Sequence, residues 1–329
     1  MAAYIIRRLL LFIPMLFAVS IIAFILIQLP PGDYLTSEIM AIAARGEEVD
    51  EAVIASLKLR YGLDRPMVEQ YYRWVTNIIT EGDFGRSFHW KKPVSELIWE
   101  RLMWTMIISS GSLLFTWMLA FPIGIYSATH QYSFADYLVT FLGFLGKATP
   151  NFLLALILMW LGFIYFDINM GGLFSSEYQN APWSFAKLVD LFQHLWVPLV
   201  VLGTAGTADL IRTLRANLLD ELSKPYVTAA RAKGMSEVKL IWKYPVRIAI
   251  NPFISSIGGV LPELISGAAI VSVVLSLPTT GPLMLNALLT QDMFLAGSFL
   301  MMLTFLSLLG TLISDILLAI LDPRIRQTV

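Results

Sequence analysis

The sequence predicts an all-α polytopic membrane protein with six transmembrane helices. Of its 329 residues, 57% are apolar and 14% are charged, whereas soluble proteins contain roughly 45–50% apolar and about 25% charged residues. The apolar residues gather in six stretches of about 20 residues or more, the length that a helix needs to cross a hydrocarbon core of roughly 30 Å. The net charge of −1 argues against nucleic acid as a partner.

Cysteine is absent, and the three histidines are far apart along the chain. This composition excludes disulfides, thiol nucleophiles, zinc ribbons and HExxH sites. We therefore expect this chain to hold no metal and no cofactor, and to do its work without a protein-bound metal ion.

The first predicted element is an N-terminal transmembrane helix within residues 1–29. Its apolar run, residues 9–29, follows Arg7 and Arg8 and ends at a Pro-Pro-Gly sequence. Basic residues before an apolar run place the N-terminus in the cytoplasm. A cleaved signal peptide is the alternative, but the run is long and no small-residue cleavage pattern precedes the prolines.

The second predicted element is a small extracytoplasmic domain, residues 30–101, between the first two spans. This segment contains nine basic and twelve acidic residues, together with several tyrosines, phenylalanines and tryptophans. A mere spacer is the alternative. The aromatic residues and the turn expected at residues 82–85 (GDFG) favour a folded cap.

The remaining residues, 102–329, are predicted to form a five-helix core. Its spans are expected at residues 102–127, 137–166, 192–212, 248–277 and 294–320. The second of them is interrupted by a Gly-Lys-Ala-Thr-Pro sequence, and we interpret it as one long, kinked helix. Six spans place both termini in the cytoplasm, in agreement with the arginines near each end.

Three charged residues fall at membrane depth, where a charge is costly unless it is paired or faces water. Glu263 is expected either to face an aqueous pathway or to pair with a partner subunit. Lys147 is expected to reach the interface or a neighbouring carboxylate rather than a solute. Asp315 is expected to make structural hydrogen bonds.

The most basic part of the chain is the segment 220–247, which we expect to be a cytoplasmic loop. Residues 209–247 contain eight basic and four acidic residues, a net charge of +4, and short basic loops stay in the cytoplasm. A basic loop can be no more than a topology signal. This one contains a helix-favouring run, residues 226–233, preceded by Pro225, which suits the first turn of a helix.

A second short helix is expected directly after the first. Gly234 stands where a left-handed residue would end the first helix. Ser236 is a good N-cap for the next helix, and Glu237 would place a negative charge in its first turn. Ala229 and Ala230 leave a surface of low relief. With Arg231 and Lys233 beside it, that surface suits insertion into a groove on another protein.

The whole chain resembles the ABC importer permeases, and most closely their dipeptide and oligopeptide branch. The resemblance begins with residues 226–234 (YVTAARAKG) and a downstream proline, Pro252, which match the loop that docks on the ATPase subunit. Similar stretches elsewhere are residues 4–14 (YIIRRLLLFIP), 31–33 (PGD), 61–66 (YGLDRP), 70–74 (QYYRW), 82–87 (GDFGRS) and 321–326 (LDPRIR).

The resemblance implies the type I importer permease fold and a place in the bacterial or archaeal cytoplasmic membrane. The chain would form the translocation pathway for small solutes, most simply di- or oligopeptides. Its partners would be a second permease subunit, two ATPase subunits that bind ATP and Mg, and an extracytoplasmic substrate-binding protein that docks on the cap. The chain itself has no ATP site, because its only Gly-Lys pair, at Lys147, lacks the rest of a P-loop.

Three positions depart from the family pattern. Thr228 replaces the glutamate that opens the coupling signature, and Ser272 stands where the branch usually has a glutamate in the fifth span. Glu263 occupies a place where an apolar residue is expected. The last two departures concern the pathway, so oligosaccharides, opines and nickel stay open as solutes.

Two functions of other classes are also possible for such a chain. An ion-coupled secondary transporter would work alone, without a partner ATPase. An intramembrane enzyme would need a catalytic constellation, and no Ser/His/Asp arrangement or intramembrane carboxylate pair is present in the sequence.

Overall fold

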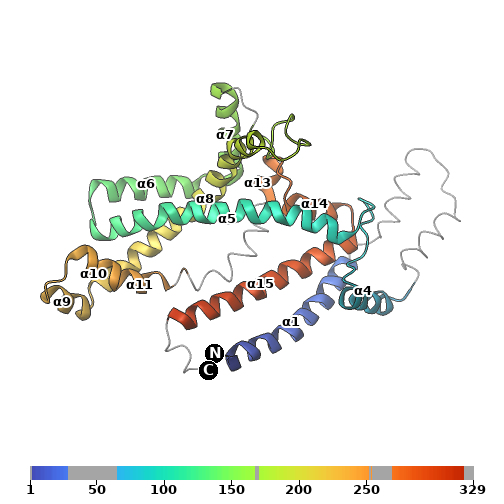
Figure 1. Cartoon of the computed structure of the whole chain (residues 1–329), viewed down its shortest axis with the longest axis horizontal. Helices are drawn as coiled ribbons and strands as arrows, with labels where there is room; N and C mark the ends of the chain where they lie inside the picture. Colours follow the sequence, from blue (N-terminus) through green and yellow to red (C-terminus); the bar gives the residue numbers. More distant parts are fainter. Residues whose placement is uncertain (1, 29–64, 167–169, 252, 254–268, 322–329) are drawn as a thin grey trace. The chain divides into compact units, whose positions relative to one another are not determined.

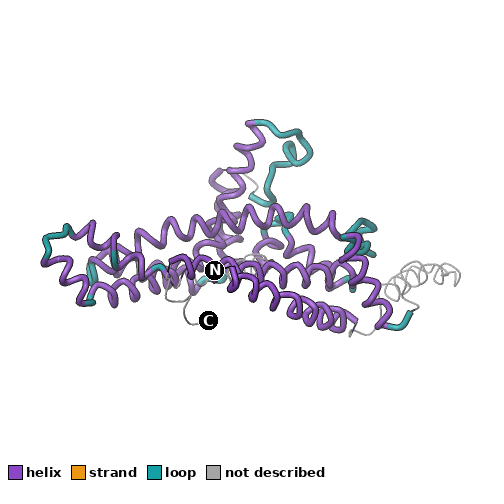
Figure 2. Tube along the Cα trace, turned by 60° about the horizontal axis from the view of Figure 1, so that its bottom comes forward, coloured by secondary structure: helices purple, strands orange, loops and turns teal. Residues whose placement is uncertain are grey.

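The computed structural model describes residues 2–28, 65–166, 170–251, 253 and 269–321. Within these ranges, the regular elements are helices (Figure 2). One isolated antiparallel bridge joins Arg86 to Pro93. The all-α prediction is therefore confirmed for the part of the chain that is described.

The helices are labelled as in Figure 1. In chain order they are α1 (Ala2–Gln28), α4 (Met67–Glu81), α5 (Val94–Thr129), α6 (Phe134–Ala148), α7 (Asn151–Phe166), α8 (Phe185–Leu222), α9 (Pro225–Ala232), α10 (Glu237–Lys243), α11 (Pro245–Ala249), α13 (Ala269–Val274), α14 (Thr280–Leu289) and α15 (Met293–Leu321).

Three helical segments are long and apolar enough to cross a membrane by themselves: Val94–Thr129, Phe185–Thr204 and Met293–Leu317. The pair α6 and α7 meets the same criteria together, as one bent element. In α1 the qualifying apolar stretch is shorter, Leu10–Ile25. Most of the span predicted at residues 248–277 lies outside the described residues, so the count of six spans stays a prediction.

The predicted kink at the Gly-Lys-Ala-Thr-Pro sequence is a complete break. α6 ends at Ala148, α7 begins at Asn151, and the two are bent by 100°. Pro150 has no N–H to donate and disfavours helical geometry in the preceding residue. Thr149 is accordingly extended (φ −85°, ψ 120°), and its N–H and hydroxyl both donate to the carbonyl of Leu145, at 3.1 and 2.9 Å.

The chain divides into two compact units. Unit 1 comprises Met1–Met103 and Thr280–Leu309, and unit 2 comprises Trp104–Thr279 and Gly310–Val329. The described part of the predicted cap, residues 65–101, belongs to unit 1 together with α1 and α14.

In unit 1, aromatic contacts join α4 to α1. The ring of Phe24 on α1 lies 5.4 Å from Tyr71 and 5.9 Å from Trp74, centroid to centroid. The hydroxyl groups of Ser20 and Tyr71 are 2.7 Å apart. A separate apolar cluster joins the start of α5 to α14 and α15 and includes Val94, Leu97, Leu283, Leu295 and Ala296.

Asp292, in the turn before α15, holds the segment between α4 and α5 in place through hydrogen bonds. Its carboxylate is fully buried and accepts the hydroxyl of Ser87 and the N–H groups of His89 and Leu295, the last two at 3.3 Å. The segment 82–85, where a turn was expected, is irregular: Gly82 and Gly85 are left-handed, and the N–H of Gly85 donates to the carboxylate of Asp83 at 2.9 Å. Gly85 is left-handed (φ +92°), and an added Cβ would come within 3.0 Å of the Phe294 ring.

In unit 2, α8 is the central helix and packs against α6, α7, α11 and α13. It runs from Phe185 to Leu222, well beyond the predicted 192–212, and measures roughly 57 Å at 1.5 Å per residue. It contributes buried residues to two of the apolar clusters of this unit, including Leu195, Val197, Val201, Leu214 and Leu218.

Glycine and alanine allow the helices around α8 to approach closely. An added Cβ on Gly146 would meet Thr204 at 2.8 Å, and one on Gly143 would meet Ala208 at 3.3 Å. Small residues have this role in membrane helices generally, because hydrocarbon offers little hydrophobic drive to association. The α6–α8 contact is therefore tight. Figure 1 shows α9, α10 and α11 at the far end of α8.

We expect Asp292→Ala to destabilise unit 1 by about 1–3 kcal/mol, because buried N–H and O–H donors lose their acceptor. Thermal unfolding of the purified protein in detergent, followed by tryptophan fluorescence, measures the effect. Ser87→Ala removes one donor and leaves the others paired, so it should cost less. Equal unfolding midpoints for wild type and Asp292→Ala would contradict the proposed fastening.

Candidate functional site

The segment 220–247 contains the two short helices, joined by a glycine turn, that its sequence predicts. α9 begins with Pro225 at its first position and ends at Ala232, and α10 begins at Glu237. Gly234 between them is left-handed, with φ +79°, and its N–H donates to the carbonyl of Arg231 at 3.0 Å. This conformation is one that glycine adopts without steric cost.

A small apolar core holds α9 against α10. Val227 and Leu240 are completely buried, and Ala230 is 9% exposed. Ala230 therefore packs inside the segment instead of contributing to its surface, whereas Ala229 is exposed. The reason is helical geometry: residues 227 and 230 are three apart and share one face.

An ion pair between Arg231 and Glu237 links the end of α9 to the start of α10. We refer to this ion pair as the brace. The guanidinium Nε donates to Oε1 at 2.5 Å and Nη2 donates to Oε2 at 3.1 Å, a bidentate arrangement. The hydrogen bond from Arg231 holds the pKa of Glu237 below its usual value. Ser236 has the extended backbone of an N-cap, but its side chain makes no capping hydrogen bond.

The braced segment is mounted on the end of α8. Val246 and Ala249 of α11 are buried against Leu214 and Leu218 of α8. At the other end of the segment, the hydroxyl of Tyr226 donates to the carboxylate of Glu221 at 2.5 Å. Partial burial and the negative Glu221 raise the pKa of Tyr226, so it remains a donor at neutral pH.

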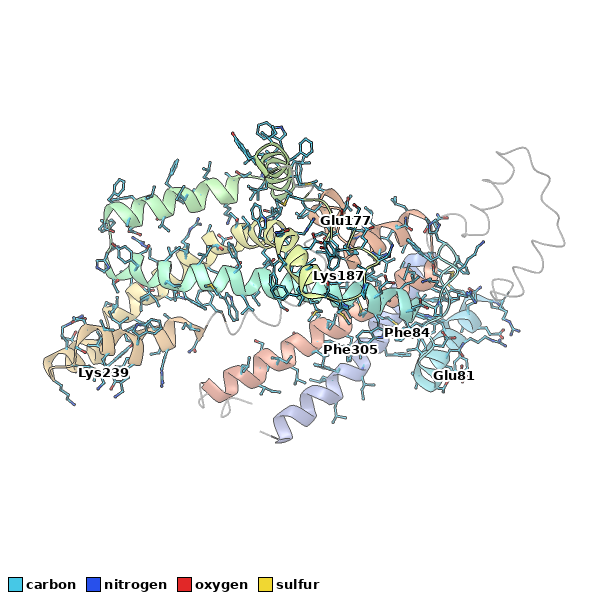
Figure 3. All side chains as sticks on the ribbon, turned by 45° about the horizontal axis from the view of Figure 1, so that its top comes forward. Glu81, Phe84, Glu177, Lys187, Lys239 and Phe305 are labelled. Atoms are coloured by element: carbon cyan, nitrogen blue, oxygen red, sulfur yellow. The ribbon has the colours of Figure 1, made fainter. Side chains whose placement is uncertain are left out.

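Part of the exposed surface of this segment was not anticipated from the sequence. Val238 is 71% exposed and Trp242 is 57% exposed, and they stand four residues apart on α10, hence on one face. Lys239 is exposed beside them (Figure 3). The spacing of Val238 and Trp242, on a different face of α10 from the buried Leu240, is the signal that could have identified this face.

Lys147, on α6, reaches a neighbouring carboxylate, which is one of its two expected roles. Its Nζ lies 2.7 and 3.0 Å from the two carboxylate oxygens of Asp209 on α8. Both side chains are about half exposed.

The other candidate residues of the predicted spans are Ser272, Asp315 and Glu263. Ser272 is buried in α13, and its carbonyl accepts the N–H of Leu277 at 2.8 Å. Asp315 lies partly buried on α15. Glu263 lies outside the described residues.

A second ion pair between α6 and α8 was also missed. Asp136 is 3% exposed, and Arg215 contacts its two oxygens at 3.1 and 2.9 Å. The N–H of Tyr132 donates to the same carboxylate at 3.0 Å. A lone acidic residue at the start of an apolar run is the only sequence signal for this pair, and its partner is 79 residues away.

Comparison with known families decides what these features belong to. A family described as "Binding-protein-dependent transport system inner membrane component" matches residues 120–327, and a family of the N-terminal part of such membrane components matches residues 1–109. The chain belongs to this permease family. It is thus a multi-pass inner membrane subunit of an ABC import system, and not the ATPase of that system.

Curated relatives match over nearly the whole permease. The oligopeptide transport system permease protein AppB of Bacillus subtilis is 36% identical over 326 residues, covering 99% of both chains. A putative peptide permease protein of Brucella ovis is 31% identical over 334 residues, covering 100% of both. The glutathione transport system permease protein GsiC of Salmonella typhimurium is 30% identical over 326 residues, covering 99% of both.

We expect Gly234→Pro in this permease to abolish transport without preventing membrane insertion. Proline fixes φ near −65° and cannot adopt the +79° of this position, so α9 and α10 lose their packing. Transport by the assembled complex in proteoliposomes measures the effect.

Gly234→Ala is the matched control. An added Cβ meets nothing within 4 Å, so only the left-handed backbone costs energy, about 1–2 kcal/mol. A partial loss of transport is expected for this variant. Full transport by Gly234→Pro would show that the turn has no role.

Proposed function

We propose that this chain is a permease subunit of an ATP-driven importer and forms the translocation pathway for di- or oligopeptides delivered by a substrate-binding protein. One observation carries the proposal furthest: a rigid, braced segment is mounted through buried apolar contacts on α8, which continues over 38 residues. The relatives support the solute class, because they are named for oligopeptide, peptide and glutathione transport.

The segment 220–247 is the part that docks on the ATPase. Its docking surface consists of the exposed residues Ala229, Lys233, Val238, Lys239 and Trp242. A half-exposed tryptophan with a neighbouring aliphatic side chain suits the desolvated centre of an interface, and lysines suit its rim. Arg231 and Glu237 hold this surface in shape, and Gly234 and Ser236 form the turn between its two helices.

The assembled system contains a second permease subunit and two ATPase subunits, which bind ATP and Mg. Both termini of this chain and the segment 220–247 lie in the cytoplasm, and the cap docks the binding protein. Opening and closing of the ATPase pair displaces α9 and α10. Because these helices are fixed to α8, the displacement rocks the permease between outward and inward states.

The intramembrane polar residues support this motion differently. The Lys147–Asp209 pair joins α6 to α8, so these helices move together. Ser272 is buried and contributes to packing beside the pathway. Glu263 is assigned either to the pathway or to a pairing with a partner subunit, and Asp315 is assigned to helix packing.

We expect the double exchange Arg231→Glu with Glu237→Arg to separate bracing from docking. Either single charge reversal places like charges together and should uncouple ATP hydrolysis from transport. The double exchange restores the pair, so coupling should return if Arg231 acts through Glu237. The measured quantity is the ratio of peptide taken up to ATP hydrolysed, with both determined in the same proteoliposomes.

Lys233→Glu is the control for charge alone, because Lys233 is exposed and outside the brace. Reversal there should weaken docking modestly and should not be rescued by Glu237→Arg. If the double exchange remained uncoupled, direct contact of Arg231 with the ATPase would replace the bracing role.

We expect uptake of peptides only when the complete complex, binding protein and ATP are present. The assay uses proteoliposomes with and without the ATPase subunits, with and without an ion gradient, and panels of radiolabelled peptides, oligosaccharides and nickel. The controls are the same vesicles with a non-hydrolysable ATP analogue.

Each arm of this assay has a distinct meaning. Uptake driven by an ion gradient without the ATPase would establish the secondary-transporter alternative and refute coupling. ATP-dependent uptake confined to oligosaccharides or nickel would retain the importer and overturn the peptide assignment.

A further inference from the structure

A groove between α6 and α8 has no role in the proposed coupling. Its lining includes Thr140, Gly143 and Phe144 of α6 and Ala208, Arg212 and Arg215 of α8. We refer to it as the α6–α8 groove. The close approach of Gly143 to Ala208 forms its floor, and the side chains on either side form its walls.

Besides Lys187 near the start of α8, this helix pair carries three basic side chains, and they differ in whether a carboxylate neutralises them. Lys147 contacts Asp209, and Arg215 contacts Asp136. Among the described residues, no carboxylate lies within ion-pair distance of Arg212; its guanidinium carbon stands 4.8 Å from the centroid of the Phe144 ring. The groove therefore carries one positive charge that the described residues do not neutralise.

The groove lies toward the end of α8 that leads into the segment 220–247, which is the cytoplasmic end in the orientation proposed above. α8 continues from Arg215 only to Leu222, and α9 begins at Pro225. At the start of α6, Tyr132 and Tyr137 are 67% and 61% exposed. Exposed tyrosines of this kind mark the membrane–water interface.

The outer face of α6 beside the groove is apolar and uncovered within the described residues. Phe141 is 64% exposed, Leu142 is 53% exposed and Leu145 is 55% exposed. Such a face suits hydrocarbon, whereas the arginine beside it suits an anion. A molecule with both parts, a phosphate and an acyl chain, is complementary to the whole arrangement.

We propose that the α6–α8 groove binds the headgroup of an anionic phospholipid from the cytoplasmic leaflet. The phosphate contacts Arg212, whose planar guanidinium can donate two parallel hydrogen bonds. Phe144 holds the guanidinium in place through a cation–π contact, and an acyl chain lies along the apolar face of α6. Basic pockets between transmembrane helices on this side of the membrane are suited to such headgroups.

The Arg212 charge favours an anionic over a zwitterionic headgroup. Phosphatidylcholine carries its own ammonium near the phosphate, so its net attraction to an arginine is small. Phosphatidylglycerol has no such group and keeps a full negative charge. Arg215 is already neutralised by Asp136 and therefore shapes the groove without setting this preference.

Native mass spectrometry of the assembled transporter tests the proposal. The delipidated complex is titrated with phosphatidylglycerol or with phosphatidylcholine, and bound lipid is counted at each concentration. We expect wild type to bind phosphatidylglycerol about tenfold more tightly than Arg212→Gln does, the size typical of a lost charge-assisted hydrogen bond. Phosphatidylcholine binding should be equal in the two proteins.

Arg247→Gln is the matched control, because Arg247 is also an exposed arginine of the basic segment and its loss changes the net charge equally. This variant should bind phosphatidylglycerol like wild type. Arg212→Lys should keep the preference for phosphatidylglycerol over phosphatidylcholine but bind phosphatidylglycerol more weakly than wild type does, since an ammonium keeps the charge but not the planar donor pair.

Three results would overturn the assignment. Equal phosphatidylglycerol binding by wild type and Arg212→Gln would remove Arg212 from the site. Displacement of the lipid by millimolar inorganic phosphate alone would show a site for a soluble anion. Loss of complex assembly in Arg212→Glu, with unchanged lipid binding, would assign the charge to a carboxylate of a partner subunit.

Discussion

The apolar contact between α8 and α11 is the interaction on which the rest of unit 2 depends. Leu214 and Leu218 are completely buried against Val246 and Ala249. Burial of each leucine side chain is worth roughly 1.5–3 kcal/mol, and salt does not screen such a contact. Separation of the segment 220–247 from α8 would expose apolar surface on all four side chains, although α5 would still cover part of the leucines. If the segment is displaced, α8 is therefore expected to move with it, because bending between the two would break this apolar contact.

The two ion pairs on the inner face of α6 extend this coupling. Because Asp136 is buried, removal of Arg215 would leave an unpaired charge at a cost of several kcal/mol. Lys147 and Asp209 are about half exposed, so their pair contributes little to stability, and the register of the two helices is set by the close packing of Gly143 and Gly146 on α8. α6 thus moves with α8, and the break at Thr149 is the place where α7 can keep a different direction.

The features that depend on residues adjacent in sequence were predictable from the sequence, whereas the ion pairs between different helices were not. Pro225 and Gly234 specify the limits of α9 through local backbone preferences, and both were predicted. The ion pair of Arg231 with Glu237 was not predicted, because the two side chains meet only when α9 and α10 adopt a defined angle. The extension of α8 to Leu222 was also missed, since its last turns are amphipathic and carry charges that end an apolar window. Likewise, the sequence could not identify Asp209 as the partner of Lys147, because the two residues are 62 positions apart.

Bracing of Arg231 changes which residues are available to an ATPase. A guanidinium already bound to Glu237 has little capacity left for a carboxylate on another protein, so it orders the segment more than it attracts the partner. The charges left for attraction are those of Lys233 and Lys239, which favour encounter more than affinity. Affinity then has to come from apolar burial, and Val238 and Trp242 are the exposed apolar side chains of α10. The proposed docking surface therefore extends from α9, which resembles the family's docking loop, onto α10, and the proposed affinity depends on the shape that the Arg231–Glu237 brace maintains.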